Sequence, residues 1–95
     1  MDKKFYQCRV CGDIHWGVNA PGICPTCQQV NAYEEAEKEK VNGLLANLAG
    51  KKLWRCIICN DLHIGKNAPE KCPTCLQINV YVEISEKELR TILEI

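Results

Sequence analysis

The eight cysteines constrain this chain more than any other feature. They fall in four close pairs with none left over: Cys8 with Cys11, Cys24 with Cys27, Cys56 with Cys59, and Cys72 with Cys75. In each half of the chain the second pair follows the first after twelve residues, enough for two short turns to face each other. Four thiolates around one ion suit zinc or iron and leave no position for a hard cation such as magnesium. The spacing therefore predicts two metal sites with these eight cysteines as ligands.

Two other uses of the cysteines fit the sequence less well. Four disulfides would suit a secreted chain, but the opening stretch, residues 1–5, contains no apolar targeting run. The two Cys-Pro-Thr-Cys motifs could each be a thiol-redox pair of the thioredoxin type, but that motif opens a helix in an α/β domain, and no such domain surrounds them. We therefore expect reduced thiols and a cytoplasmic location.

Composition and charge exclude several classes of function. The 95 residues are 46% hydrophobic and carry a formal net charge of zero, so the surface is not built to neutralise many phosphates. No stretch approaches the roughly 18 to 20 apolar residues that a membrane span needs. No paired carboxylates, no nucleophile with a base and no open metal position are visible. We expect no nucleic-acid partner, no membrane partner and no enzymatic activity.

The second half of the chain repeats the first. A shift of 48 residues superimposes all four cysteine pairs, and half of the 32 aligned positions, 5–36 against 53–84, are identical. This indicates an internal duplication of one metal module. The matched pairs outside the cysteines include Asp13 with Asp61, His15 with His63, and Gly17 with Gly65. Because four thiolates already fill each tetrahedron, we expect the histidines to pack or to support the ligands, and not to bind the metal.

Each metal module is expected to consist of short strands and tight turns. After a loose tail over residues 1–4, residues 5–7 have the aromatic, extended character of a strand leading to the first cysteine. Gly12 accepts the positive φ of a turn whose backbone N–H groups point at the sulfurs. Residues 13–21 contain turn formers and indicate a returning loop. Residues 30–33 favour an extended piece that pairs with the first strand and brings Tyr33 to the cysteines.

A helix is predicted after each module. The acidic and basic run from Glu34 leads into apolar residues spaced as on one face of a helix, which predicts an amphipathic helix over 37–49 with Gly50 as its stop. Glu34 and Lys38 are spaced to pair on that helix. Residues 85–88 form a capping box and predict a second helix over 86–95. We expect the apolar stripes of these helices to pack against each other, the modules or a second chain.

The domain organisation follows from these elements. We predict a small metal-bound fold of two zinc-ribbon-like modules of short β-strands and knuckle turns, each followed by an α-helix. The expected boundaries are 1–36 for the first module, 37–50 for the helix and linker, 51–84 for the second module and 85–95 for the C-terminal helix.

Two stretches carry a resemblance to a known family. They run from residue 6 to residue 27 and from residue 54 to residue 75, and they resemble, in tandem, the rubredoxin-like domain at the C-terminus of rubrerythrins. The twelve-residue gap is similar to the rubrerythrin type, whereas rubredoxin has a longer insertion. The resemblance implies a mononuclear Fe(Cys)4 centre for one-electron transfer. The chain contains no four-helix di-iron domain, so the resemblance implies a carrier and not a peroxidase.

Three positions depart from the pattern of that family. Glycine usually follows the second cysteine of each turn, but Gln28, Asn60 and Leu76 stand there. Asparagine tolerates a positive φ, whereas leucine adopts it at a cost of roughly 1 kcal/mol. We therefore expect Leu76 to mark a slightly different turn.

The functional prediction has one main alternative. We expect a one-electron transfer protein with two iron ions, one per module, and redox partner proteins of unknown identity. The alternative is a structural or adaptor protein with two Zn(Cys)4 sites, because zinc binds the same thiolates and is a common occupant in recombinant protein. We also expect that the chain could self-associate through the apolar stripes of its helices.

Overall fold

Six short strands form one antiparallel sheet in this computed structural model, which describes residues 2–95. The strand order is β3-β1-β2-β5-β4-β6, so each half of the chain contributes three neighbouring strands. The elements in chain order are β1 (Lys4–Cys8), β2 (Ile14–Gly17), β3 (Tyr33–Ala36), α1 (Lys38–Ala46), β4 (Lys52–Cys56), β5 (Leu62–Gly65), β6 (Tyr81–Ile84) and α2 (Glu86–Leu93).

The two halves meet where β2 pairs with β5 at the middle of the sheet. In this pairing Ile14 faces Ile64, and His15 faces His63. The expectation of a returning loop over residues 13–21 was wrong for its first part, because Ile14–Gly17 is strand β2. A strand of four residues gives too short a pattern to recognise, and the turn formers in residues 17–21 favoured a loop.

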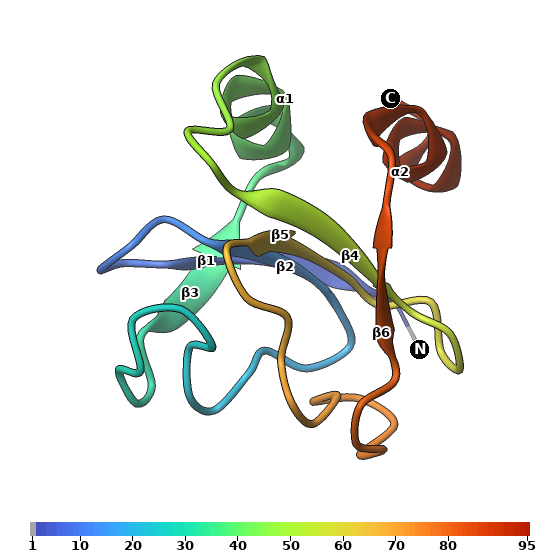
Figure 1. Cartoon of the computed structure of the whole chain (residues 1–95). Coiled ribbons are helices and arrows are strands. Elements are labelled where there is room, and N and C mark those ends of the chain that lie inside the picture. The colour runs from blue at the N-terminus through green and yellow to red at the C-terminus, as the bar shows by residue number, and fades with distance from the viewer. Residues whose placement is uncertain (1) are drawn as a thin grey trace.

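The sheet separates a helical layer from a layer of turns. Figure 1 shows α1 and α2 on one side of the sheet and the long loops that precede β3 and β6 on the other. Ile14, Leu62 and Ile64 face the helices, and they form one core with buried residues of the other elements. These further core residues are Val41, Leu45, Leu53, Leu89 and Leu93.

The predicted helices are present, with shorter bounds and different neighbours. The first begins at Lys38 and ends at Ala46, and Glu34 lies in β3, so its expected pairing with Lys38 on one helix was wrong. Gly50 has a left-handed φ of 88° but lies in a later turn and does not end the helix. The capping residue Ser85 accepts a hydrogen bond from the Glu88 N–H at 3.2 Å, as predicted. The apolar stripes of both helices are covered by the sheet of the same chain.

Both helices are also short in relation to the thickness of a membrane. Among the described residues, none of the helices is long and apolar enough to cross one.

Candidate metal centres

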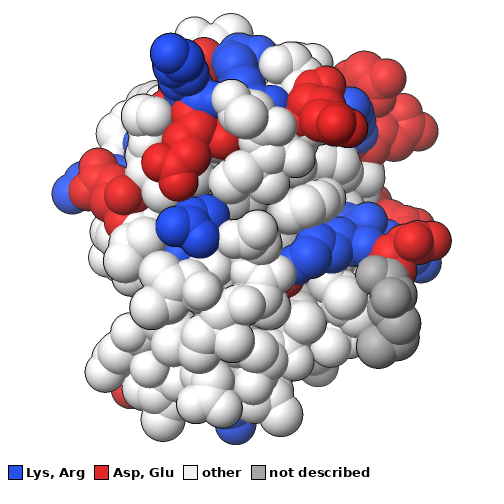
Figure 2. All heavy atoms as spheres, turned by 90° about the vertical axis from the view of Figure 1, so that its right-hand side faces the viewer, with Lys and Arg blue, Asp and Glu red and all other residues white. Residues whose placement is uncertain are grey.

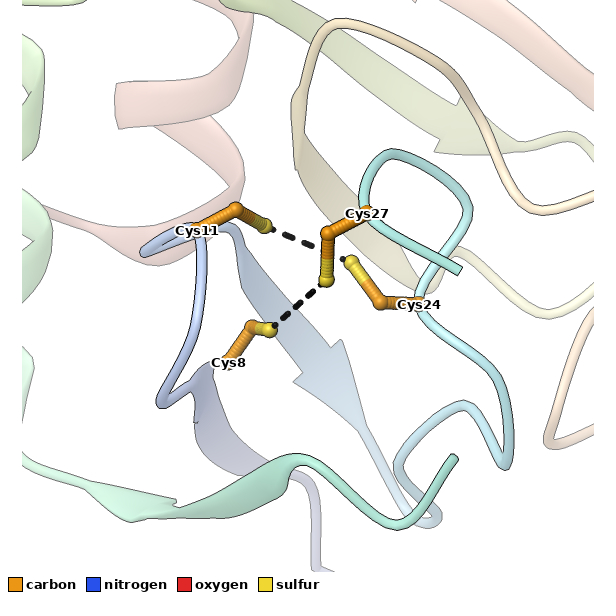
Figure 3. Close-up of side chains that lie close together, drawn as sticks. All are labelled: Cys8, Cys11, Cys24 and Cys27. Carbon is orange, nitrogen blue, oxygen red and sulfur yellow. Dashed lines mark hydrogen bonds between the residues drawn. The ribbon is translucent and has the colours of Figure 1, made fainter. Parts of the chain in front are cut away.

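The first four cysteines converge below the sheet. Cys8 ends β1, Cys11 follows in the next turn, and Cys24 and Cys27 lie in the long loop before β3. Figure 3 shows the four sulfur atoms pointing toward one another. The Sγ atoms of Cys8 and Cys27 are 3.6 Å apart, and those of Cys11 and Cys24 are 3.4 Å apart. All four Sγ atoms lie within 4.8 Å of one another, a grouping that could hold one metal ion.

The last four cysteines form the same arrangement in the second half. The Sγ atoms of Cys56 and Cys75 are 3.7 Å apart, and those of Cys59 and Cys72 are 3.5 Å apart. In each group two cysteines are buried and two are partly exposed. The sequence prediction is confirmed in that the structure gathers the eight side chains into the two expected groups. Their ligation of a metal remains a prediction.

The sulfur spacing fits a tetrahedral metal site. A tetrahedron with metal–sulfur bonds of about 2.3 Å has sulfurs about 3.8 Å apart, and the closest pairs here lie at 3.4 to 3.7 Å. All eight cysteines are free of disulfides. The donor set is therefore suited to one thiophilic ion at each site.

The turns that present the cysteines share one backbone conformation. The residue after the second cysteine donates its N–H to the carbonyl of the first, as from Gly12 to Cys8 at 3.0 Å and from Leu76 to Cys72 at 2.9 Å. The φ angles are 82° at Gly12, 65° at Gln28, 68° at Asn60 and 66° at Leu76. The expectation of a different turn at Leu76 was wrong, because the leucine adopts the same left-handed conformation as the other three residues.

Backbone N–H groups already favour the thiolate form of two buried cysteines. Burial raises the pKa of Cys8, but the N–H groups of Cys11 and Val10 outweigh burial and bring the pKa to about 7. At Cys56 the N–H groups of the corresponding turn also outweigh burial and lower the pKa. Burial raises the pKa of Cys11, so a nearby cation would be needed to hold all four groups as thiolates.

A tyrosine hydroxyl supports each group of cysteines. Tyr33 donates a hydrogen bond to Cys24 Sγ at 3.5 Å, and Tyr81 donates to Cys72 Sγ at 3.5 Å. Burial raises the pKa of both phenols, with the neighbouring cysteines adding to the effect, so both hydroxyls keep their protons. The predicted position of Tyr33 beside the cysteines is confirmed.

Two buried aspartates connect the halves. Asp13 lies 3.9 Å from Cys24 Sγ of its own half and forms an ion pair with Lys51, which belongs to the other half. In the same way Asp61 lies 3.7 Å from Cys72 Sγ and 2.5 Å from Lys3 Nζ. The expectation of a loose tail over residues 1–4 was wrong for Lys3, which makes this contact, and for Lys4, which begins β1; Met1 lies outside the described residues.

Both aspartates remain ionised despite their burial. Burial raises the pKa of Asp13, but the neighbouring His63 ring, the ion pair with Lys51 and the hydrogen bond from Thr26 outweigh it and hold the pKa well below its usual range. The Thr26 hydroxyl donates to Asp13 Oδ2 at 2.6 Å. For Asp61 the balance is the same, with bonds from His15 and Lys3 outweighing burial.

The two histidines lie back to back at the centre of the sheet. His15 and His63 are fully buried, and their Nδ1 atoms are 3.1 Å apart. His15 Nε2 lies 3.2 Å from Asp61 Oδ2, and His63 Nε2 lies 3.5 Å from Asp13 Oδ2. Each histidine therefore reaches the aspartate of the other half. Both rings lie outside the two cysteine groups, and the expectation that they pack or support the ligands stays a prediction.

Sequence reasoning noted the aspartates only as matched positions, and it gave the histidines a packing or supporting role without identifying their partners. Their contacts cross between the repeats, so no spacing within one repeat could reveal them. The one available signal was that Asp13, His15 and Gly17 recur together in the second half, although a metal site with four thiolate ligands needs none of them as a ligand.

Fold and site together define a class of small proteins that bind metal through four cysteines on two facing turns. The family model for the rubredoxin-like domain of rubrerythrin matches residues 6–33 and 54–77, which is more than half of the chain. The chain belongs to this family, as tandem rubredoxin-like domains. Comparisons with curated proteins and with solved structures found no match.

Proposed function

We propose that this protein is a one-electron carrier that binds one iron ion at each group of four cysteines. The observation that supports this most directly is the pair of cysteine groups, in each of which four Sγ atoms lie within 4.8 Å of one another and could fill a tetrahedral site. Iron held by four thiolates would supply one-electron chemistry by cycling between the ferric and ferrous states. A complete ligand set favours electron transfer over catalysis, because no substrate can reach the metal.

The surroundings of the sulfurs suit this role. Reduction adds negative charge to a site, and the hydrogen bonds from backbone N–H groups and from Tyr33 and Tyr81 would stabilise that charge on the sulfurs. Cys11, Cys27, Cys59 and Cys75 are partly exposed, so each site has an edge through which an electron could pass to a partner.

The surface around these edges suits a partner that docks by apolar contact. Figure 2 shows few charged side chains over the lower part of one face, the level at which Figure 1 places the turns below the sheet. Several large apolar side chains are exposed in these turns: Val10, Ile23, Val30, Ile57, Ile58, Leu76 and Ile78. We propose a redox protein of the cytoplasm as the partner. The basic residue Arg55 adds little net charge to the surface, because it is half-buried and pairs with Glu88.

Metal analysis and a spectroelectrochemical titration test this proposal. Protein isolated from its own source organism should contain two iron ions per chain and take up two electrons per chain. The variants Cys27→Ser and Cys75→Ser should each retain one iron and take up one electron. Protein that contains only zinc when isolated from that source would contradict the proposal and favour the structural alternative.

A further inference from the structure

A row of buried polar side chains joins the two groups of cysteines. It runs from the first group through Asp13 and His63 to His15 and Asp61, and so to the second group. The carboxylates and rings have no exposed surface. Each of these polar atoms must therefore find its partner within the row or in the flanking lysines and hydroxyls.

The contact between the two Nδ1 atoms of the histidine rings requires a proton on one of them. When two ring nitrogens lie 3.1 Å apart, one must donate and the other must accept. The Nε2 atom of each ring faces a carboxylate oxygen, which can only accept. If both Nε2 atoms donated, the pair would hold three protons and a positive charge. Burial opposes that charge. It lowers the pKa of His15 to about 4, and it also lowers the pKa of His63 from its usual value.

A neutral pair holds two ring protons and cannot serve both aspartates. One proton lies between the Nδ1 atoms, and the ring that accepts it carries the other proton on Nε2. We propose that His15 and His63 form a two-state hydrogen-bond switch, which donates an N–H to the carboxylate beside only one group of cysteines at a time. The switch goes beyond electron transfer and requires only a metal ion at each site, zinc included.

The two ends of the row differ in their contacts. His15 Nε2 is within hydrogen-bond distance of Asp61, at 3.2 Å, whereas His63 Nε2 is buried without a hydrogen-bond partner, 3.5 Å from Asp13. This corresponds to a proton on His15 Nε2 and a proton on His63 Nδ1. In this state the carboxylate beside Cys72 is bonded to a histidine, and the carboxylate beside Cys24 is not.

The opposite state has protons on His15 Nδ1 and His63 Nε2. Conversion moves the Nδ1 proton from His63 to His15. His63 gains a proton at Nε2 from solvent, and His15 releases its Nε2 proton to solvent. One proton enters and one leaves, so the charge of the pair is unchanged. Lys51 and Lys3, which pair with the two carboxylates, are 12% and 20% exposed and place both ends of the row near solvent.

The switch makes two matched sites unequal. A hydrogen bond to Asp61 withdraws part of the negative charge that faces Cys72, so the second site tolerates added negative charge better than the first. Reversal of the switch would reverse this difference. The two sites would then respond to each other although they share no ligand.

Nitrogen NMR of the zinc-loaded protein tests the inference. With 15N-labelled histidine at pH 7, long-range proton–nitrogen spectra distinguish protonated from unprotonated ring nitrogens. We expect two protonated nitrogens, His15 Nε2 and His63 Nδ1. Three protonated nitrogens, or a proton on Nε2 of both rings with none between them, would overturn the proposal. Because zinc has no redox chemistry, this result is independent of the proposed electron transfer.

Two matched variants test whether the pair switches. In the first variant, His15→Asn, the asparagine amide lies near the position of His15 Nδ1 but cannot reach Asp61. His63 should then move its proton from Nδ1 to Nε2, because the bond to the Asp13 carboxylate is the stronger one. In the control, His63→Asn, His15 should keep its proton on Nε2. An unchanged tautomer of His63 in His15→Asn would overturn the switch, and if either variant fails to fold, the wild-type spectrum decides.

Discussion

At the scale of single residues, the turns below the sheet carry avoidable strain. The four equivalent positions after the second cysteine of each turn are left-handed, but only Gly12 is a glycine. Leu76 is the least suited of the others, since its side chain is branched and 59% exposed and gains little from packing. We infer that an exposed leucine at this position serves a partner contact and does not add stability.

Replacement of Leu76 by glycine should stabilise the protein. Relief of the left-handed strain is worth about 1 kcal/mol, and this gain should appear as a higher free energy of unfolding of the zinc-loaded protein in guanidinium chloride. Ile78→Gly is the control, because Ile78 is similarly exposed but does not have a positive φ. That variant should lose stability. A Leu76→Gly protein no more stable than the wild type would show that the leucine is not strained.

Gly17 and Gly65 are required for a reason that their sequence does not reveal. Gly17 was expected to lie in a returning loop, but both glycines end a strand. A Cβ on Gly17 would collide with the carboxylate of Asp61, and one on Gly65 would collide with that of Asp13. Turn propensity is a local property, whereas this requirement arises from a contact between residues far apart in the chain.

Gly65→Ala should therefore destabilise the protein by about 1–3 kcal/mol, the usual cost of overpacking. The matched control is Gly43→Ala, in the exposed interior of α1 where a Cβ meets nothing within 4 Å. That variant should gain up to about 1 kcal/mol from helix propensity. Thermal unfolding of the zinc-loaded variants measures both changes, and equal shifts in the same direction would contradict the assigned contact.

At the scale of elements, the helices and the strand before the first cysteine could be predicted, whereas the central strands could not. The extended piece expected over 30–33 shares only Tyr33 with β3, which runs from Tyr33 to Ala36. The helices have an apolar period and, at Ser85, a capping residue, and β1 has an aromatic approach to Cys8. The sequence of β2 alternates Ile14 and Trp16 with His15 and Gly17, and both sets are largely covered, the first by the helices and the second by the other half. No local pattern predicts a strand whose second face is covered by its own repeat.

The helices should contribute stability mainly through their contacts with the sheet. Leu89 is fully buried in the core, so Leu89→Ala should lower the free energy of unfolding by about 2–5 kcal/mol. The same change at the exposed Leu76 should alter it by less than about 0.5 kcal/mol. Chemical denaturation of both zinc-loaded variants provides the comparison. Similar losses would show that α2 does not depend on its core contacts.

At the scale of the whole molecule, the sheet makes one unit of two metal modules. Each metal module alone, 1–36 or 51–84, is smaller than the roughly 40 residues at which an apolar core usually suffices, so bound metal should supply much of the folding free energy. The repeats also share the central strand pair and the buried ion pairs between Asp13 and Lys51 and between Asp61 and Lys3.

Removal of metal should thus unfold both halves together. In a chelated and reduced sample, we expect the dispersed amide NMR signals of residues 5–33 and 53–81 to disappear at the same chelator concentration. Loss of one set while the other remains would show that the halves fold independently. Wild-type protein reloaded with zinc is the control, and it should regain both sets.

The pairing of β2 with β5, in which His15 faces His63, implies that each half is self-complementary. A chain that contained a single copy of the repeat could make the same contacts with a second identical chain, each histidine facing its own counterpart and each aspartate receiving a lysine from the neighbour. The present protein then corresponds to a homodimer whose subunits have been joined through the exposed Ala49 and Gly50. Joining has allowed the two copies to diverge, and with them the two metal sites, which identical subunits could never do.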